Sequence, residues 1–520
     1  MRQTLSGGAM RWLIVLMCIA RALPCAAAEN IEPRPVDVIQ GTADAYQPAL
    51  RWHWKDVSVE SPMSLRTRFE SVNSFPLDAD GTTLGKNFFI QPQLRIGTRV
   101  EWTPQGPVRF FAEYEHDIVT GSLVGAPDVA GDRLPNGQKT HNELRKLYGR
   151  ITFYDLIVVS GGYNMSNWGL GLLANDGAHG WTPGSARFSD PRGGDRVMRA
   201  SVGTVPLTDY GIVVRAAYDT SVIADEQLLS GDNAQQAIFS ALVGDGQRST
   251  AGLYLVYRDQ DSTVRRGFDV FVADVMASTS QDIALGTLTL AGEGVLVNGH
   301  TTLGPNPDFQ SHDIFELGGT LRASLDRRNH GGVFEVLYAS GDQNLDDGDQ
   351  NAFRIDPNYE YGLFLFRYMV AGQTGRAAVT AANPIIVGRP APDLERISTA
   401  GSPTNTVAFF PRAWWRPRNG LEAYGGPMFA LTEVSYTDPF NTITSARAGG
   451  SSRNALNGDP GSFWGTELNL GVRYRALLNG AEVTLGIEGG VLCPGSAFRN
   501  SAGNIMNEVA GGRVMLDYRL

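Results

Sequence analysis

Residues 312–342 read HDIFELGGTLRASLDRRNHGGVFEVLYASGD, and the rest of the chain repeats the pattern in this stretch. From Phe315 to Leu325 every second residue is apolar or small, and polar or charged residues fill the gaps. A period of two is that of a β-strand with one apolar and one polar face. A polar turn at 326–332 reverses the chain into a second alternation, in which Phe334 and Val336 flank Glu335. The stretch therefore predicts a β-hairpin with a short turn at one end, and a long acidic and aromatic segment follows it.

The same alternation recurs along most of the chain, for example at 94–102 with 108–114 and at 468–474 with 483–487. Long polar segments separate these pairs of strands. Short turns are expected near residues 103–107, 155, 206, 245, 279, 329, 418 and 479. Short connections on one side and long ones on the other are typical of an outer-membrane β-barrel.

With both chain ends on the periplasmic side, eight short turns give about 18 strands. We therefore expect an all-β fold: a single transmembrane antiparallel up-and-down β-barrel over residues 63–520, with short periplasmic turns and long extracellular loops. The last strand, 512–520, must pair with the first, because lipid does not tolerate an open sheet edge. Residues 235–300 alternate poorly, and either a strand or an extracellular helix fits there. The alternative, a soluble propeller or an array of β-sandwiches, would show connections of similar length.

Composition agrees with an all-β membrane protein. The chain has 520 residues, of which 42% are hydrophobic and 19% charged, and it contains 61 glycines. After the N-terminus, no stretch is long and apolar enough for a spanning helix. A membrane form of this chain must therefore be a closed sheet.

Residues 1–28 resemble a secretory signal peptide. Arg2 and Arg11 precede the apolar stretch 12–20, and the small residues 26–28 suggest cleavage before Glu29. Residues 29–62 would then form an N-terminal periplasmic segment. Cleavage would leave Cys493 as the single cysteine, so no internal disulfide is expected. It would also remove three arginines and change the net charge from −10 to −13, which argues against nucleic acid as a partner.

Arginine is the main cation of the predicted polar face. By parity, the following residues are expected to line the lumen: Arg66, Arg68, Arg95, Arg99, Arg109, Arg150, Arg215, Arg258, Arg322, Arg412, Arg473 and Arg475. One interpretation is an anion-attracting constriction, because a guanidinium binds carboxylate or phosphate with two donors. The other is that these arginines pair across strands with wall glutamates and stiffen the barrel. The sequence leaves both open.

Motifs of enzymes and of metal sites are missing from the sequence. It contains no Gly-x-Ser-x-Gly, no His-Glu-x-x-His and no phosphate-binding glycine loop. The acidic loop from Asp342 has calcium-like spacing, but Asp347 stands where glycine is needed and Phe353 where a bidentate acid is needed. We therefore expect no catalytic residue, no metal site and no cofactor.

Two windows resemble the alginate-export family of outer-membrane porins. The first runs from Phe334 to Phe366 and contains Ser340, Gly341 and Asp342. The second runs from Val159 to Met198 with Trp168 and Gly169, and is similar to a variant met in δ-proteobacterial outer-membrane proteins. The resemblance implies an 18-stranded barrel that passes solutes, or a secreted anionic polysaccharide, through an arginine-rich lumen.

The function expected from the sequence is therefore passage of an exopolysaccharide, or of another hydrophilic solute, across the outer membrane of a Gram-negative cell. The partners expected are outer-membrane lipid, the solute itself and periplasmic export proteins. A general diffusion porin for small solutes is the first alternative, and a non-conducting structural or adhesin barrel is the second. Whether residues 341–405 plug the pore is left open.

Overall fold

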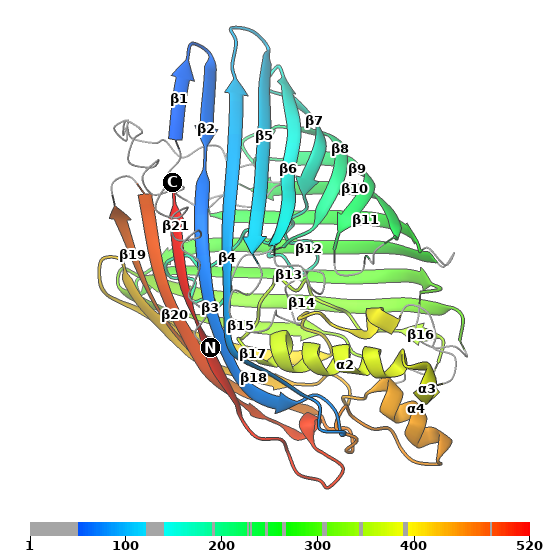
Figure 1. Ribbon diagram of the computed structural model, residues 1–520. Helices are drawn as coiled ribbons and strands as arrows, with labels where there is room; N and C mark the ends of the chain where they lie inside the picture. Colours follow the sequence, from blue (N-terminus) through cyan, green and yellow to red (C-terminus); the bar gives the residue numbers. More distant parts are fainter. Residues whose placement is uncertain are drawn as a thin grey trace, which may run out of the picture.

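In the computed structural model the chain forms one closed antiparallel β-barrel (Figure 1). The structure describes residues 50–520, apart from 121–139, 190–192, 226–227, 229–230, 245–247, 263–266, 304–308, 343–346, 388–393 and 479–480. The predicted signal peptide, most of the predicted periplasmic segment and the turns at 245 and 479 lie outside the described residues.

Eighteen strands form the barrel wall, as the sequence predicts. Each strand pairs antiparallel with its neighbours, and the last strand pairs with the first from Arg519 opposite Ser64 to Gly511 opposite Val72, which closes the barrel. The strands are β3 (Met63–Pro76), β4 (Thr83–Trp102), β5 (Val108–Thr120), β6 (Thr140–Phe153), β7 (Ile157–Met165), β8 (Arg196–Thr204), β9 (Val213–Ala224), β10 (Asn233–Gly244), β11 (Ser249–Asp261), β12 (Gly267–Ile283), β13 (Gly286–Thr301), β14 (His312–Arg327), β15 (His330–Ala339), β17 (Thr406–Arg418), β18 (Leu421–Leu431), β19 (Phe463–Leu478), β20 (Ala481–Pro494) and β21 (Val509–Arg519).

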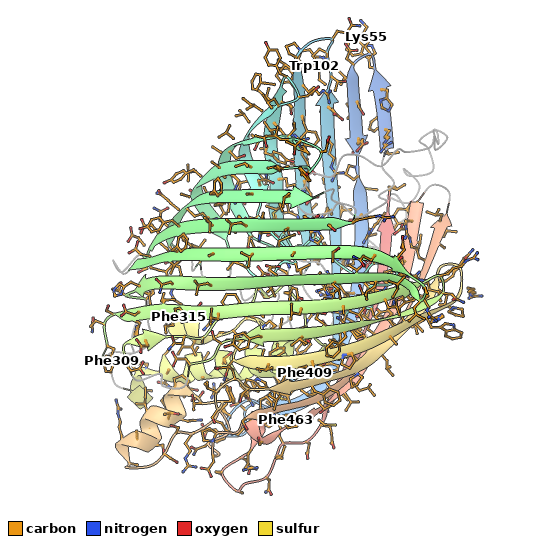
Figure 2. All side chains as sticks on the ribbon, turned by 180° about the vertical axis from the view of Figure 1, so that it is seen from behind. Lys55, Trp102, Phe309, Phe315, Phe409 and Phe463 are labelled. Carbon is orange, nitrogen blue, oxygen red and sulfur yellow. The ribbon has the colours of Figure 1, made fainter. Side chains whose placement is uncertain are left out.

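The two-residue alternation separates an apolar outer surface from a polar inner one. In β14, Phe315 and Leu321 are 53% and 68% exposed, whereas Thr320 between them is buried. Figure 2 looks onto the outer side of this wall and labels Phe315 and Phe409 there. Large apolar side chains that are exposed all around a closed barrel are stable only in lipid. The protein is therefore an integral outer-membrane barrel.

Some strand ends differ from those predicted from the sequence. The turn expected near 279 lies at 284–285, because the polar residues after Ala277 stay in the ladder, with Ser280 opposite Thr289 and their hydroxyls 2.8 Å apart. The turn expected over 326–332 is shorter, since Arg327 pairs with His330. The poorly alternating region 235–300 contains strands β10 to β13 and no helix in its described residues.

A short hairpin precedes the barrel and joins its wall. It consists of β1 (Leu50–Trp54) and β2 (Val57–Ser61), and β2 pairs with the end of β4. The remaining elements lie in the long connections: β16 (Asp349–Gln350), η1 (Leu365–Val370), α2 (Ala371–Ala381), α3 (Pro384–Val387), η2 (Leu394–Ile397), α4 (Pro439–Arg447) and η3 (Ser496–Phe498). Among the described residues, no helix is both long and apolar enough to cross a bilayer.

The apolar core lies inside the barrel rather than in its wall. Residues of two long connections, among them Trp168, Phe188, Phe353 and Leu365, are buried together with inward-facing wall residues such as Phe410. Folded chain therefore occupies part of the lumen of this 18-stranded barrel.

Candidate functional site: a lumen crossed by two inward segments

Residues 166–189, here called the first inward segment, leave the end of β7 and lie across the lumen. The indole N–H of Trp168 donates to Asp274 of β12 at 3.1 Å, and its ring stacks on Tyr254 of β11 with centroids 4.9 Å apart. Further along, the backbone N–H of Gly184 donates to Glu422 of β18 at 2.8 Å. Because these partners come from separate parts of the wall, the segment spans the interior.

Charged wall residues bind the backbone of this segment. The N–H groups of Leu170 and Leu172 both donate to the carboxylate of Glu293 in β13, the latter at 3.3 Å. At the other end, the carbonyl of Phe188 accepts from Arg513 of β21. A loop inside a barrel has little water to satisfy its peptide groups, so the wall must supply the partners.

Residues 347–387, the second inward segment, enter from the connection after β15. The carboxylate of Glu467 in β19 accepts the backbone N–H of Leu363, of Phe364 at 3.1 Å and of Leu365 at 2.9 Å. The two inward segments also contact each other, because the N–H of Asp356 donates to the carbonyl of Leu172 at 2.8 Å. Part of the connection after β15 therefore packs against the inner side of the wall, and its helix α2 is seen beside β17 in Figure 1.

Two guanidinium groups pair with one carboxylate, and a third lies nearby, where the two inward segments meet the wall. Arg322 of β14 lies 2.9 Å from Glu335 of β15, and Arg412 of β17 pairs with the other oxygen of the same carboxylate. Tyr359 of the second inward segment accepts from Arg322 at 3.0 Å and donates to Glu335. Arg187 of the first inward segment is the third cation, and its charge interacts with those of Arg322, Glu335 and Arg412. These five residues form what we call the arginine cluster, which carries two more positive charges than negative ones.

The arginine cluster has unused hydrogen-bond donors. The Nε atoms of Arg322 and Arg412 are buried without a hydrogen-bond partner among the described residues. Repulsion by Arg322 and burial lower the pKa of Arg187 to about 10, so this guanidinium is still charged at neutral pH. An anion bound beside Arg187 would relieve this repulsion and would use donors that are otherwise left unpaired.

Most of the twelve predicted lumen arginines pair with wall carboxylates. The distances are 2.7 Å for Arg95 to Asp117, 2.9 Å for Arg99 to Glu113, 2.6 Å for Arg66 to Asp517, 2.7 Å for Arg473 to Glu488 and 2.8 Å for Arg475 to Glu482, and Arg258 pairs with Asp225. Neighbouring strands supply the two partners in most pairs, as cross-strand bracing requires.

The other predicted arginines have different surroundings. Arg109 is exposed beside the turn after β6 and pairs with Asp155 at 3.0 Å, which places it at the rim. The guanidinium of Arg150 lies over the ring of Phe111 with 4.6 Å to the centroid. Arg68 and Arg215 are buried in the wall. Only Arg322 and Arg412 of the twelve belong to the arginine cluster.

The residues of the two family-like windows lie at the roots of the inward segments. The hydroxyl of Ser340 donates to the carbonyl of Asn351 at 2.6 Å, and Asp342 accepts the N–H of Asn351 at 3.2 Å. The N–H of Gly341 donates to Glu433 at 3.1 Å. Their role in the structure is to turn the chain into the lumen.

Trp168 and Gly169 have the same position at the root of the first inward segment. Gly169 has a φ of +57°, and a Cβ there would lie 2.6 Å from a carboxylate oxygen of Glu293. Glycine therefore allows the peptide backbone to approach the wall carboxylate closely.

Sequence reasoning missed Arg187 and Tyr359 as cluster residues, because they lie in connections without strand periodicity. Their loops showed only an enrichment in aromatic residues and glycine, which does not indicate a position in the lumen. Within the described part of the chain, no group of three or more His, Cys, Asp or Glu side chains is arranged to hold a metal ion. Residues 343–346 of the calcium-like loop lie outside it.

Comparison with known proteins identifies the fold. No family model matches the chain, and no curated protein matches it. Among solved structures, Pseudomonas aeruginosa OccK9 (OpdG) superposes with a TM-score of 0.52 at 11% identity, over 90% of this chain and 98% of that one. Acinetobacter baumannii OccAB1 gives 0.51 at 11% identity, over 89% and 96%. Pseudomonas aeruginosa OccK2 (OpdF), solved in complex with glucuronate, gives 0.50 at 11% identity, over 89% and 98%. The fold is that of the Occ and Opd barrels.

Proposed function

We propose that this protein is an outer-membrane channel for small hydrophilic solutes that prefers anions. The observation that carries the proposal is the arginine cluster, in which Arg322 and Arg412 share the carboxylate of Glu335 and Arg187 lies close enough to repel Arg322, at the junction of the two inward segments. A net positive charge in a narrow, low-dielectric passage attracts anions and repels cations. Weak binding at such a site lets the solute leave again.

Two observations favour a small solute over a polymer. The inward segments lie across the lumen and are bound to several parts of the wall, which leaves less room for a thick chain. The related fold of OccK2 was solved with glucuronate, which is a single uronic acid. Export of an anionic polysaccharide, the first expectation from the sequence, is therefore our second candidate. Periplasmic export partners would belong to that candidate only.

Planar bilayers and liposome swelling test the proposal together. The purified protein should give discrete conductance steps with a reversal potential shifted toward the anion in a salt gradient. Proteoliposomes should swell faster in glucuronate than in a neutral sugar of the same size, and uronate oligomers should block the current rather than pass. Absence of conductance from the folded protein would contradict the proposal and favour a structural barrel.

A further inference from the structure

The hairpin β1–β2 stands where the barrel closes. On this side, the pairing of the last strand, β21, ends at Leu520, which exchanges backbone hydrogen bonds with Met63 at 2.8 and 2.9 Å. The strand that it pairs with continues beyond Met63 through Pro62 into β2, which runs along β4 as far as Val57 opposite Trp102. Strand β1 then pairs with β2 and continues the line of β21. Figure 1 shows the C-terminus just below β1.

The tip of the hairpin is level with the short turns of the barrel. The N–H of Thr103, in the turn between β4 and β5, donates to the carbonyl of Asp56 at the hairpin tip at 2.9 Å. Figure 2 shows Lys55, the other tip residue, and Trp102 at the same end of the molecule. The hairpin thus extends the wall to the periplasmic rim at the place where the last strand, β21, pairs with the first and ends before the rim.

The two faces of the hairpin continue the two faces of the wall. On one face, Arg51 pairs with Glu60 at 2.8 Å, and Glu60 stands opposite Arg99 of β4. This face continues the charged inner surface.

The other face is a row of large apolar residues. Trp52 of β1, Val59 of β2 and Val100 of β4 form one row across the three strands. Trp54, Val57 and Trp102 form the next row on the same face. The ring of Trp102 stacks on Phe110 of β5 with centroids 4.9 Å apart. Trp52, Trp54 and Trp102 are 52%, 70% and 44% exposed. The apolar face therefore continues without a break into the lipid-facing surface of the barrel.

We infer that the hairpin β1–β2 is an interfacial anchor that binds the phospholipid headgroup region of the periplasmic leaflet. Two features place it at this depth. Among the described strands, β1 pairs only with β2, and a strand with an open edge does not lie in the hydrocarbon core. Its tryptophans are too exposed for a site wholly in water, and tryptophan prefers the interface between lipid and water.

The hairpin tip fits the same partner. The ammonium group of Lys55 lies 5.2 Å from the ring centroid of Trp54. An aromatic ring in the acyl boundary with a cation just outside it matches the apolar and anionic layers of a phospholipid surface. Tyr154 and Tyr210, exposed at two other short turns, supply the same kind of side chain along the rim.

Fluorescence quenching of the full-length protein in lipid bilayers tests this inference. The signal of interest is the difference in tryptophan emission between the native protein and the double variant Trp52→Phe/Trp54→Phe. In bilayers whose lipids carry bromine high on the acyl chains this difference should lose most of its intensity. Bromine near the ends of the acyl chains should quench this difference signal much less. Acrylamide, which stays in the water, should quench it only weakly. Trp181→Phe is the matched control, because Trp181 lies inside the barrel against Tyr424 and its difference signal should not respond to brominated lipid.

The opposite result would overturn the inference. If acrylamide quenches the Trp52 and Trp54 signal fully and brominated lipid does not, the hairpin projects into the periplasm, where another protein strand would be the occupant to look for. Both substitutions keep an aromatic ring at an exposed site, so the variant should fold, and its heat-modifiable band on a gel checks this. Conductance plays no part in the readout, so this inference and the proposed function fail independently.

Discussion

The carboxylate of Glu467 in the wall accepts the backbone N–H of Leu365, which is 102 residues away along the chain, at 2.9 Å. The same carboxylate accepts the N–H groups of Leu363 and Phe364, so one side chain holds the turn at which the second inward segment becomes helical. A carboxylate that accepts several backbone donors makes strong, charge-assisted bonds. The position of the segment in the lumen therefore depends on a wall residue that is distant in the sequence.

Glu467→Ala should widen the channel. The substitution leaves three backbone N–H groups of the second inward segment without an acceptor, which destabilises its inward position by about 3 kcal/mol. Single-channel recordings should show a larger unit conductance and more frequent switching between levels. Glu482→Ala is the control, because the partner of Glu482 is Arg475 of the neighbouring wall strand. Equal conductance of the native channel and Glu467→Ala would show that the segment is held by packing alone.

The arginine cluster should set ion selectivity. Arg187→Gln removes one of the three cations of the cluster, and Glu335 keeps both of its ion-pair partners. The preference of the channel for anions should therefore fall severalfold. Arg187→Lys should keep most of the preference, because the charge remains. Arg109→Gln at the exposed rim is the matched control and should change the reversal potential little. A Gln variant with the native reversal potential would place the selectivity elsewhere in the lumen.

The paired arginines call for a different test, because removing an arginine alone also exposes its carboxylate. In Arg475→Gln, the unpaired Glu482 should shift selectivity toward cations, and in Glu482→Gln the unpaired Arg475 should shift it toward anions. The double variant should return to the native reversal potential, because the pair contributes no net charge. If the double variant keeps the cation selectivity of Arg475→Gln, Arg475 acts on solutes and does not merely brace the wall.

The fold was largely predictable from the sequence because its driving force is periodic. Phe315, Leu321 and Phe334 alternate with polar residues, and lipid outside and charge inside enforce that alternation on every strand. The turn at 284–285 was misplaced because Ser280 and Gln281 have the composition of a loop, although they remain paired in the sheet.

The candidate site was much less predictable. Parity selected Arg322 and Arg412, which belong to the arginine cluster, but it also selected arginines that pair within the wall. Arg187 and Tyr359 come from connections whose path depends on wall residues far away in the chain, such as Glu293 and Glu467. Local sequence carries no signal for such contacts.

Gly318 and Gly319 are adjacent glycines with opposite tolerance of substitution. A Cβ at Gly318 would lie 2.1 Å from the ring of Phe353, which is buried in the second inward segment, whereas a Cβ at Gly319 would meet nothing closer than a backbone oxygen at 3.3 Å. Gly318→Ala should therefore displace Phe353 and make the segment more sensitive to added protease. Gly319→Ala is the matched control and should be cleaved at the native rate. Equal cleavage of the two variants would mean that Phe353 can move aside at little cost.

The extracellular helix α4 should become less stable as the pH rises through about 6. Asp438 caps this helix by accepting the N–H of Asn441 at 2.7 Å, but burial raises the pKa of its carboxyl to about 6 from an ordinary value near 3.8. Because the folded loop holds the proton more tightly than the unfolded one, its stability is highest below pH 4, falls between pH 4 and pH 6 and is then constant. The shift corresponds to a loss of up to about 3 kcal/mol.

Hydrogen exchange of the amides in α4 measures this effect. In the native protein, exchange corrected for its intrinsic pH dependence should be slower at pH 5 than at pH 7.5. Asp438→Asn keeps a good helix cap but cannot ionise, so its protection should be the same at both pH values. A pH-dependent protection that persists in Asp438→Asn would assign the titration to another group of the loop.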